Sequence, residues 1–139
     1  LARLAAALRA LGLDVVTTSW RVIQADSLDP RLKCIGRYAA NIMAKREANM
    51  QNAGEGLMLN QQGYVAECTG DNIFIVRDGV LRTPHPSCGI LQGITRDTVI
   101  DLAKRAGIPV VEDFMTIYDV TAFREEIKYG TPYLAGTTA

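Results

Sequence analysis

The sequence predicts an α+β fold in which helices pack on an antiparallel or mixed sheet. Residues 56–67 and 72–84 each contain two short apolar runs around a Gly-containing turn, the pattern of paired strands. Helical patterns precede and follow these two segments. Because strand-rich and helical blocks are separate along the chain, the order favours α+β. At 139 residues the chain has the size of one domain.

Two helical patterns and one extended segment precede the strand pairs. Leucines at helical spacing predict an N-terminal helix that ends at Gly12: Leu1, Leu4, Leu8 and Leu11. Residues 14–24 are β-branched and partly alternating, which predicts one bent strand or two short ones. A helix over residues 38–53, closed by Gly54, is expected from apolar residues that recur at helical spacing: Ala39, Ile42, Met43, Met50 and Ala53.

The four strands of the two pairs are expected to form an antiparallel meander. Gly63 lies in the turn of the first pair, and Asp78 and Gly79 form the tip of the second. The next helix has complete end signals, which are Thr95 at its start, Asp97 in the first turn, Lys104 and Arg105 in the last turn, then Gly107 and Pro109. A strand over residues 109–114, a short helix over 117–128 and a strand over 133–136 complete the expected order.

Composition and charge exclude several classes of function. Basic and acidic residues number 15 each, so neither a nucleic-acid groove nor binding to an anionic membrane is indicated. The three cysteines lack C-x-x-C spacing and His85 is the single histidine, which argues against a metal site and fits a reducing compartment. No apolar run is long enough to span a membrane, and the N-terminal stretch lacks a signal-peptide layout. A cytoplasmic location is therefore expected.

Three residues from different segments together indicate one kind of chemistry. Lys33 lies just before the helix over residues 38–53, Tyr38 begins that helix, and Glu67 ends an apolar strand. Alone, Lys33 is most simply a solvated charge and Glu67 a marker of the sheet edge. Together they meet the needs of pyridoxal phosphate: an amine that forms a Schiff base, a carboxylate that keeps the ring nitrogen protonated, and a donor to the phenolic oxygen.

Two short turns could hold the phosphate of such a cofactor. A phosphate binds backbone N–H groups at a helix N-terminus and small hydroxyl side chains. The run "GIT" at residues 93–95 opens a predicted helix and offers both. The run "GTT" at residues 136–138 is a second candidate. Alone, the first is most often a helix cap and the second a plain turn, so the prediction depends on their occurrence beside the lysine and the glutamate.

With these residues in place, the chain resembles the class IV aminotransferases, and most closely their branched-chain amino-acid aminotransferases. The resemblance is carried by "SWR", "LKCIGRY", "AKREA", "GYVAECTGDNIFIVRDGVLRTP", "GILQGITRDTVIDLAKRAGIPV" and "AGTTA". The most specific feature is the pairing of a "YVAE-x-x-G-[DE]-N-x-F" strand with "GITRD". The resemblance implies the D-amino-acid aminotransferase-like fold of pyridoxal-phosphate enzymes, of which residues 1–139 would be part of the large C-terminal domain.

The resemblance also implies roles for single residues. Lys33 falls on the lysine that forms the aldimine with the cofactor and moves the substrate proton. Tyr38 falls on the tyrosine beside the phenolic oxygen, and Glu67 on the glutamate beside the pyridine nitrogen. The other implied positions are Leu91 over the ring, Gly93, Ile94, Thr95, Gly136 and Thr137 around the phosphate, Thr137 and Thr138 at the substrate carboxylate, and Gly70 at the pocket mouth.

The activity implied is reversible amino transfer between leucine, isoleucine or valine and 2-oxoglutarate, in a homodimer or larger assembly. Two other enzymes of the same fold, D-amino-acid aminotransferase and aminodeoxychorismate lyase, share the lysine and the glutamate and stay open as alternatives. A non-catalytic fragment that only binds the cofactor is a further alternative. No metal, nucleic acid or membrane is expected as a partner.

The sequence also departs from the family pattern. The small N-terminal domain, which supplies an arginine to the phosphate, and the final strands of the sheet are expected to be missing from residues 1–139. Arg37 stands where the family usually has a small or amide residue, and Gln92 where proline is common. The segment before the second Gly-Thr turn also differs, which affects the placement of Thr137. Cys34 and Cys68 are interpreted as packing residues.

Overall fold

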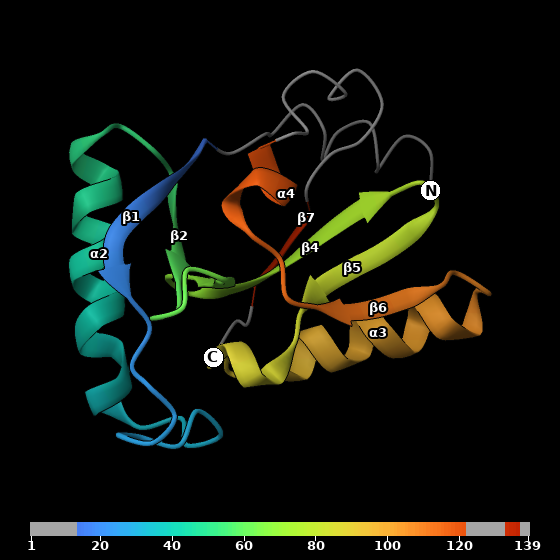
Figure 1. The fold of residues 1–139 in the computed structure, drawn as a ribbon, viewed down its shortest axis with the longest axis horizontal. Helices are drawn as coiled ribbons and strands as arrows, with labels where there is room; N and C mark the ends of the chain where they lie inside the picture. The colour runs from blue at the N-terminus through green and yellow to red at the C-terminus, as the bar shows by residue number, and fades with distance from the viewer. Residues whose placement is uncertain (1–13, 122–132, 137–139) are drawn as a thin grey trace.

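The structure, a computed structural model, describes residues 14–121 and 133–136 (Figure 1). Its strands are β1 (Val15–Arg21), β2 (Glu55–Leu59), β3 (Val65–Cys68), β4 (Asp71–Arg77), β5 (Val80–Pro84), β6 (Val110–Asp113) and β7 (Tyr133–Gly136). Its helices are α2 (Tyr38–Met50), α3 (Ile94–Arg105) and α4 (Ile117–Thr121), with short 3-10 helices η1 (Ile35–Arg37) and η2 (Pro86–Cys88). The α+β class is confirmed, whereas the helix expected from Leu1 to Leu11 lies outside the described residues.

The strands form two mixed sheets. The first sheet has the order β1-β2-β3, with β1 parallel to β2 and β2 antiparallel to β3. The second has the order β6-β5-β4-β7, in which only the β5–β6 pair is parallel. Both predicted hairpins form, and Asp78 and Gly79 have the positive φ angles, 51° and 74°, of a tight two-residue hairpin turn.

The expectation of one antiparallel meander is wrong, because β3 and β4 belong to different sheets. The chain bends at Thr69 and Gly70 between these strands. The backbone N–H of Thr69 donates to the Glu55 carboxylate at 3.1 Å and to the Gly56 carbonyl at 3.0 Å. These bonds hold the end of β3 against β2, so the hairpin that follows enters the second sheet.

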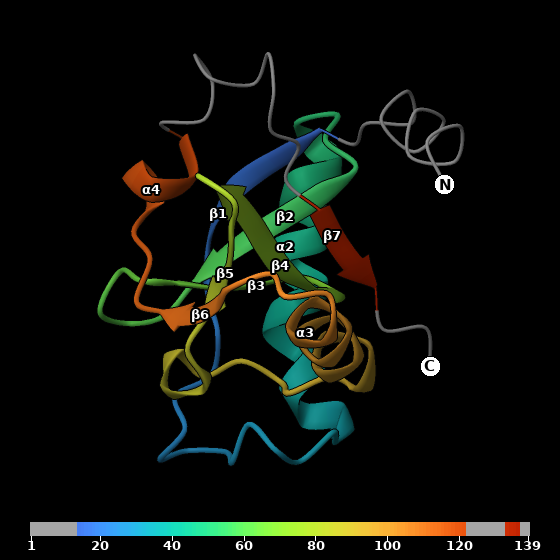
Figure 2. The ribbon, with the colours of Figure 1, turned by 90° about the vertical axis from the view of Figure 1, so that its right-hand side faces the viewer.

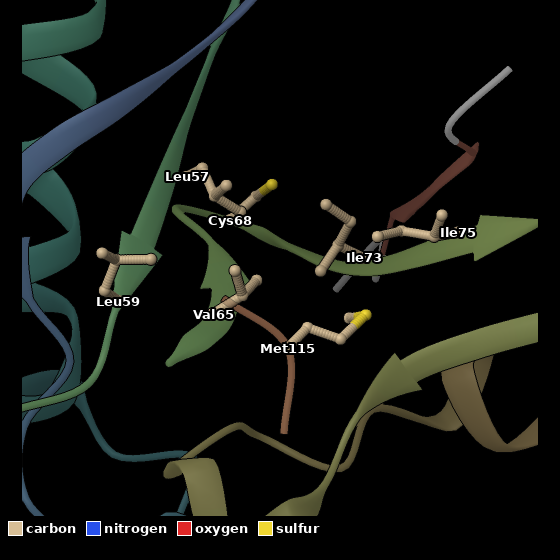
Figure 3. Close-up of a cluster of buried hydrophobic side chains, with 7 residues drawn as sticks. All are labelled: Leu57, Leu59, Val65, Cys68, Ile73, Ile75 and Met115. Atoms are coloured by element: carbon tan, nitrogen blue, oxygen red, sulfur yellow. The ribbon is translucent and has the colours of Figure 1, made fainter. Parts of the chain in front are cut away.

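The two sheets and their helices are layered, with an apolar cluster between each pair of layers. Helix α2 packs on β1 and β2, and α3 packs against the second sheet (Figures 1 and 2). Strand β4 shows the expected alternation, since Ile73 and Ile75 face the first sheet whereas Phe74 contacts the cluster that includes Ile100 of α3. Figure 3 shows the cluster between the sheets: Leu57, Leu59, Val65, Cys68, Ile73, Ile75 and Met115.

Helix α2 differs from its sequence pattern in length and in the face that it buries. It ends at Met50 rather than Ala53, and its large apolar side chains point to solvent, with Ile42 66% and Met50 75% exposed. The buried side is made of Asn41, Ala44 and Ala48. A Cβ added to Gly56 of β2 would lie 3.3 Å from the Ala44 carbonyl oxygen, which shows how closely helix and sheet approach. Only small side chains fit between them.

The remaining predicted elements are present where the structure describes them. Helix α3 begins one residue before Thr95 and ends at Arg105, and Gly107, two residues beyond, has a φ of 73°. The Ile108 N–H bonds back to the Ala103 carbonyl at 2.9 Å, as in a glycine-terminated helix. The first five residues of the expected short helix form α4, and 133–136 form β7 as expected. No helix among the described residues is long and apolar enough to cross a membrane.

Candidate active site

A small cavity lies where the N-terminus of α2, the bend between β3 and β4, and the loop before α3 meet. Three of the predicted site residues besides Glu67 line it, namely Tyr38, Gly70 and Leu91. Tyr38 is the first residue of α2 and is half-buried, whereas Gly70 is exposed at the bend. The tertiary structure thus brings together residues that lie up to 53 positions apart in sequence, from Tyr38 to Leu91.

Glu67 is a buried wall of this cavity, with 5% of its surface exposed. Each of its carboxylate oxygens accepts one hydrogen bond: Oε1 from Arg37 Nη2 at 2.8 Å and Oε2 from the Leu91 backbone N–H at 2.8 Å. An ionised carboxylate has about four acceptor positions. Two positions therefore remain for a further donor, such as a protonated ring nitrogen.

Arg37 reaches Glu67 from η1, the short turn that leads into α2. Its guanidinium is 3% exposed and forms the buried ion pair with Glu67. The same Nη2 atom also donates to the Gly89 carbonyl at 2.7 Å. The other terminal nitrogen, Nη1, is buried without a hydrogen-bond partner among the described residues.

The ionisation of Glu67 is set by two opposed effects. Burial raises the pKa of the Glu67 carboxyl, because removing water disfavours the charged form. The positive charge of Arg37, the Leu91 N–H and the hydrogen bond from Arg37 act in the opposite direction but offset burial only in part, so the pKa of Glu67 stays above its ordinary value. The carboxylate therefore depends on Arg37 for its charge.

Two buried asparagines support the walls of the cavity. The Asn41 side-chain amide donates to the Thr69 carbonyl at 2.9 Å and joins α2 to the end of β3. The Asn72 side-chain amide donates to the Leu91 carbonyl at 2.9 Å and joins β4 to the loop before α3. Both bonds fix backbone positions that adjoin Glu67.

Lys33 lies apart from the residues that line the cavity. It is exposed in the irregular segment between the turn at Asp29 and Pro30 and helix η1. Of the described residues that line the cavity, Arg37 is the nearest to Lys33 in the sequence, four positions later. The structure therefore places the predicted lysine on the segment that enters the site, with its side chain in solvent.

The two predicted phosphate turns lie on different elements. Gly93 is the N-cap of α3 and has an extended backbone, with a φ of −74° and a ψ of 147°. It is followed by Ile94, which is 86% exposed, and by half-buried Thr95. The first N–H groups of a helix have no partner within it, so they can bind an anion. Gly136 in β7 pairs with Asp71, the residue next to Gly70. Thr137 and Thr138 lie outside the described residues.

Sequence reasoning missed two supporting residues of the site, Arg37, which bonds Glu67, and Asn72, which bonds Leu91. Arg37 was interpreted as a departure from the family pattern that lies beside the cofactor and affects its affinity, and Asn72 as part of a motif. No local signal in the sequence joins Arg37 to Glu67, which lies 30 positions later. The interpretation of Cys34 as a packing residue is wrong, because Cys34 is exposed, whereas Cys68 is buried in the cluster between the sheets. No group of acidic, histidine or cysteine side chains suited to a metal occurs in residues 14–121 and 133–136.

The two-sheet α+β fold thus places a buried carboxylate, which accepts one hydrogen bond at each oxygen, in a cavity beside the N-terminus of α2. Residues 1–131 match the protein family described as amino-transferase class IV. The chain belongs to this family.

Known relatives give the same result. The chain is 44% identical over 120 residues to a putative branched-chain-amino-acid aminotransferase of Methanocaldococcus jannaschii, covering 86% of the chain and 41% of the relative. It is 36% identical over 120 residues to the branched-chain-amino-acid aminotransferase of Escherichia coli, covering 86% of the chain and 39% of the relative. The chain thus spans about two fifths of the length of these relatives.

Solved structures are similar over most of the chain. A branched-chain aminotransferase from Thermoproteus uzoniensis, solved with norvaline, superposes with a TM-score of 0.78 at 41% identity and covers 91% of this chain and 40% of its own. The branched-chain amino acid aminotransferase from Thermobaculum terrenum in its PLP form gives 0.78 at 38% identity, covering 91% and 39%. These similarities confirm the fold that the resemblance implied.

Proposed function

We propose that the full-length protein containing this chain is a pyridoxal-phosphate-dependent aminotransferase that exchanges amino groups between leucine, isoleucine or valine and 2-oxoglutarate. The observation that carries the proposal is Glu67, a buried carboxylate held from both sides at a cavity that Tyr38 and Leu91 also line. Family membership and the branched-chain aminotransferases among the relatives support this choice.

The residues present fit the cofactor in their chemistry. Glu67 keeps free acceptor positions for a ring N–H, and the first N–H groups of α3 suit a phosphate. The cavity itself encloses about 20 Å³, room for a water molecule. Half-buried Leu91, in the wall of this cavity, would present apolar surface to a pyridoxal ring.

Bound pyridoxal phosphate supplies an electron sink for the carbanion of the amino acid. Glu67 holds the proton on the ring nitrogen, because a nearby negative charge favours the protonated form. Tyr38 donates its hydroxyl proton toward the phenolic oxygen. Lys33 would hold the cofactor through its amine and would move a proton at the substrate α-carbon, which one basic nitrogen on a flexible stem can do.

The remaining residues bind and orient. Gly93, Ile94 and Thr95 bind the phosphate through backbone N–H groups and a hydroxyl, and Gly136 and Thr137 supply a second turn to it. Thr137 and Thr138 receive the substrate carboxylate. Gly70 leaves the mouth of the cavity open, and Leu91 excludes water from the ring. We further propose a cytoplasmic enzyme that acts as a homodimer or larger assembly on small amino and 2-oxo acids.

An absorbance spectrum tests this function. The full-length protein mixed with pyridoxal phosphate is expected to show the band of a lysine-bound cofactor, and Lys33→Ala to lack it. Lys104→Ala, an exposed lysine near the end of α3, is the matched control and should keep the band. Added leucine is expected to bleach the band as the amino group is transferred.

Other outcomes would identify the alternatives. Bleaching by D-alanine and not by leucine would favour a D-amino-acid aminotransferase. Conversion of aminodeoxychorismate, with no response to either amino acid, would favour the lyase. A stable band that no substrate changes would indicate a cofactor-binding protein, and no band in the unsubstituted protein would refute the proposed function.

A further inference from the structure

Arg37 is a feature of the site that the proposed function leaves unexplained. Its guanidinium is 3% exposed, and its Nη2 atom bonds both Glu67 Oε1 at 2.8 Å and the Gly89 carbonyl at 2.7 Å. Arginine stays protonated in proteins, so this is a permanent buried positive charge. Among the described residues, the salt-bridge partner that neutralises it is Glu67.

The pair has a defined geometry around the cavity. Arg37 bonds one oxygen of Glu67 from the α2 side, and the Leu91 N–H bonds the other from the loop before α3. The carboxylate is thus held at both oxygens and cannot rotate without breaking a bond in a buried environment. Arg37, Glu67 and Leu91 all line the same cavity.

A ring nitrogen bonded to Glu67 would share one proton with it. The proton lies either on the ring nitrogen, which leaves a carboxylate, or on the carboxyl, which leaves a neutral ring. A positive charge that contacts Glu67 stabilises the carboxylate strongly. It repels a ring N–H⁺ beyond the carboxylate more weakly, because Coulomb energy falls with distance. Arg37 therefore favours the proton on the ring.

We propose that Arg37 is a positioning residue that keeps Glu67 charged and oriented, and so places the shared proton on the cofactor ring nitrogen. The inference rests on the proposed function, since it requires pyridoxal phosphate at this site. It gives a role to Arg37, one of the residues by which the sequence departs from its family pattern. Removal of the charge should move the proton to Glu67 and weaken the electron sink.

The test measures the ring proton directly. The full-length protein is loaded with pyridoxal phosphate labelled with nitrogen-15 in the ring, and the nitrogen chemical shift is recorded by NMR. We expect a protonated ring in the unsubstituted protein and a shift toward the unprotonated value in Arg37→Gln and Arg37→Met. Arg37→Lys, which keeps a positive charge, should restore most of the protonated signal. The dissociation constant for the cofactor should rise about tenfold or more in Arg37→Met, through loss of the charged hydrogen bond.

Controls separate positioning from folding. Arg82→Met breaks another ion pair, that of Arg82 with Asp113 at 2.6 Å, and should leave the ring signal unchanged. If Arg37→Met does not fold, Arg37→Gln, which can still donate to Glu67, carries the test. The double variant Arg37→Met, Glu67→Gln should be more stable than Arg37→Met alone. It leaves no buried carboxylate without its positively charged partner.

Two results would overturn the inference. A protonated ring nitrogen in folded, loaded Arg37→Gln would show that Arg37 has only a structural role, and the proposed function would still stand. Absence of bound cofactor in the unsubstituted protein would overturn the proposed function together with this inference.

Discussion

The side chain of Asn72 donates a hydrogen bond of 2.9 Å to the backbone carbonyl of Leu91. Leu91 in turn donates its own N–H to Glu67 at 2.8 Å. The first residues of β4 therefore anchor the peptide that orients the buried carboxylate. This relay makes Asn72 part of the site although its side chain bonds no predicted catalytic atom.

Replacement of Asn72 should loosen that anchor. In Asn72→Ala the half-buried Leu91 carbonyl loses its donor, and we expect the free energy of unfolding to fall by about 1–3 kcal/mol. The Leu91 amide should also exchange its hydrogen faster, measured by NMR, because its peptide opens more easily. Gln61→Ala, an exposed amide in the β2–β3 turn, is the control and should change neither quantity. An unchanged exchange rate in Asn72→Ala would show that the relay does not act.

The tight packing around β2 can be tested at glycines. A Cβ at Gly56 would lie 2.8 Å from Thr18 Cγ2 and 3.1 Å from Thr69 Cγ2, so Gly56→Ala should cost about 1–3 kcal/mol of stability through overpacking. At Gly36 a Cβ meets no atom within 4 Å. Gly36→Ala should therefore be neutral or stabilising by less than about 1 kcal/mol. Urea unfolding measures both, and equal effects would contradict this packing.

Acid should weaken the fold through Glu55. Burial alone would raise the pKa of Glu55, but hydrogen bonds from Thr69, the Gly56 N–H and Lys45, together with the Lys45 charge, outweigh it and lower the pKa. The folded state thus binds this proton less tightly than the unfolded chain. Its stabilisation is present above the ordinary pKa of 4.5 and is lost as pH falls through the lowered value.

The variant Glu55→Gln isolates this effect. Its deficit in the free energy of unfolding relative to the unsubstituted protein should be largest near neutral pH and shrink as pH falls below about 4.5. Thr69→Val, which removes one donor to Glu55, should weaken the pH dependence without abolishing it. A deficit that is constant across this range would mean that the carboxylate has an ordinary pKa in the folded protein.

Two arginines of α3 should differ in their contribution to stability. Arg96 is 1% exposed and donates to Glu112 at 2.7 Å and to the Pro84 carbonyl at 3.1 Å, so Arg96→Met should cost about 1–3 kcal/mol by leaving a buried carbonyl without its donor. Arg105 forms an exposed pair with Asp101, and Arg105→Met should cost only about 0.5 kcal/mol. Thermal unfolding compares them directly. Similar losses would refute a structural role for buried Arg96.

Elements with strong local signals were predicted correctly. The hairpin tip at Asp78 and Gly79 needs two positive φ angles, which these residue types accept, and the turn residues alone specify it. Helix α3 has its acidic first turn, basic last turn and glycine stop within one short segment. Such features need no distant partner, so the sequence is enough to predict them.

Features that depend on distant contacts were predicted less well. The close approach of β2 decides which face of α2 is buried. The spacing of apolar residues along a helix does not predict how closely a strand approaches it. The separation of β3 and β4 into two sheets depends on bonds from Thr69 to Glu55 and Gly56 across the first sheet. The partner of Glu67 is Arg37, 30 positions earlier, and no spacing rule joins them.

The sequence by itself determined the α+β class, the hairpins, α3 and the family whose motifs surround Lys33, Tyr38 and Glu67. These properties are encoded in neighbouring residues, through backbone preferences and motif spacing. Only the tertiary structure decided which charge faces Glu67 and which side of α2 is buried. Both depend on contacts between elements far apart in the chain. In the absence of water, one buried ion pair determines the charge beside Glu67, and one close packing distance determines which side chains of α2 fit against the sheet.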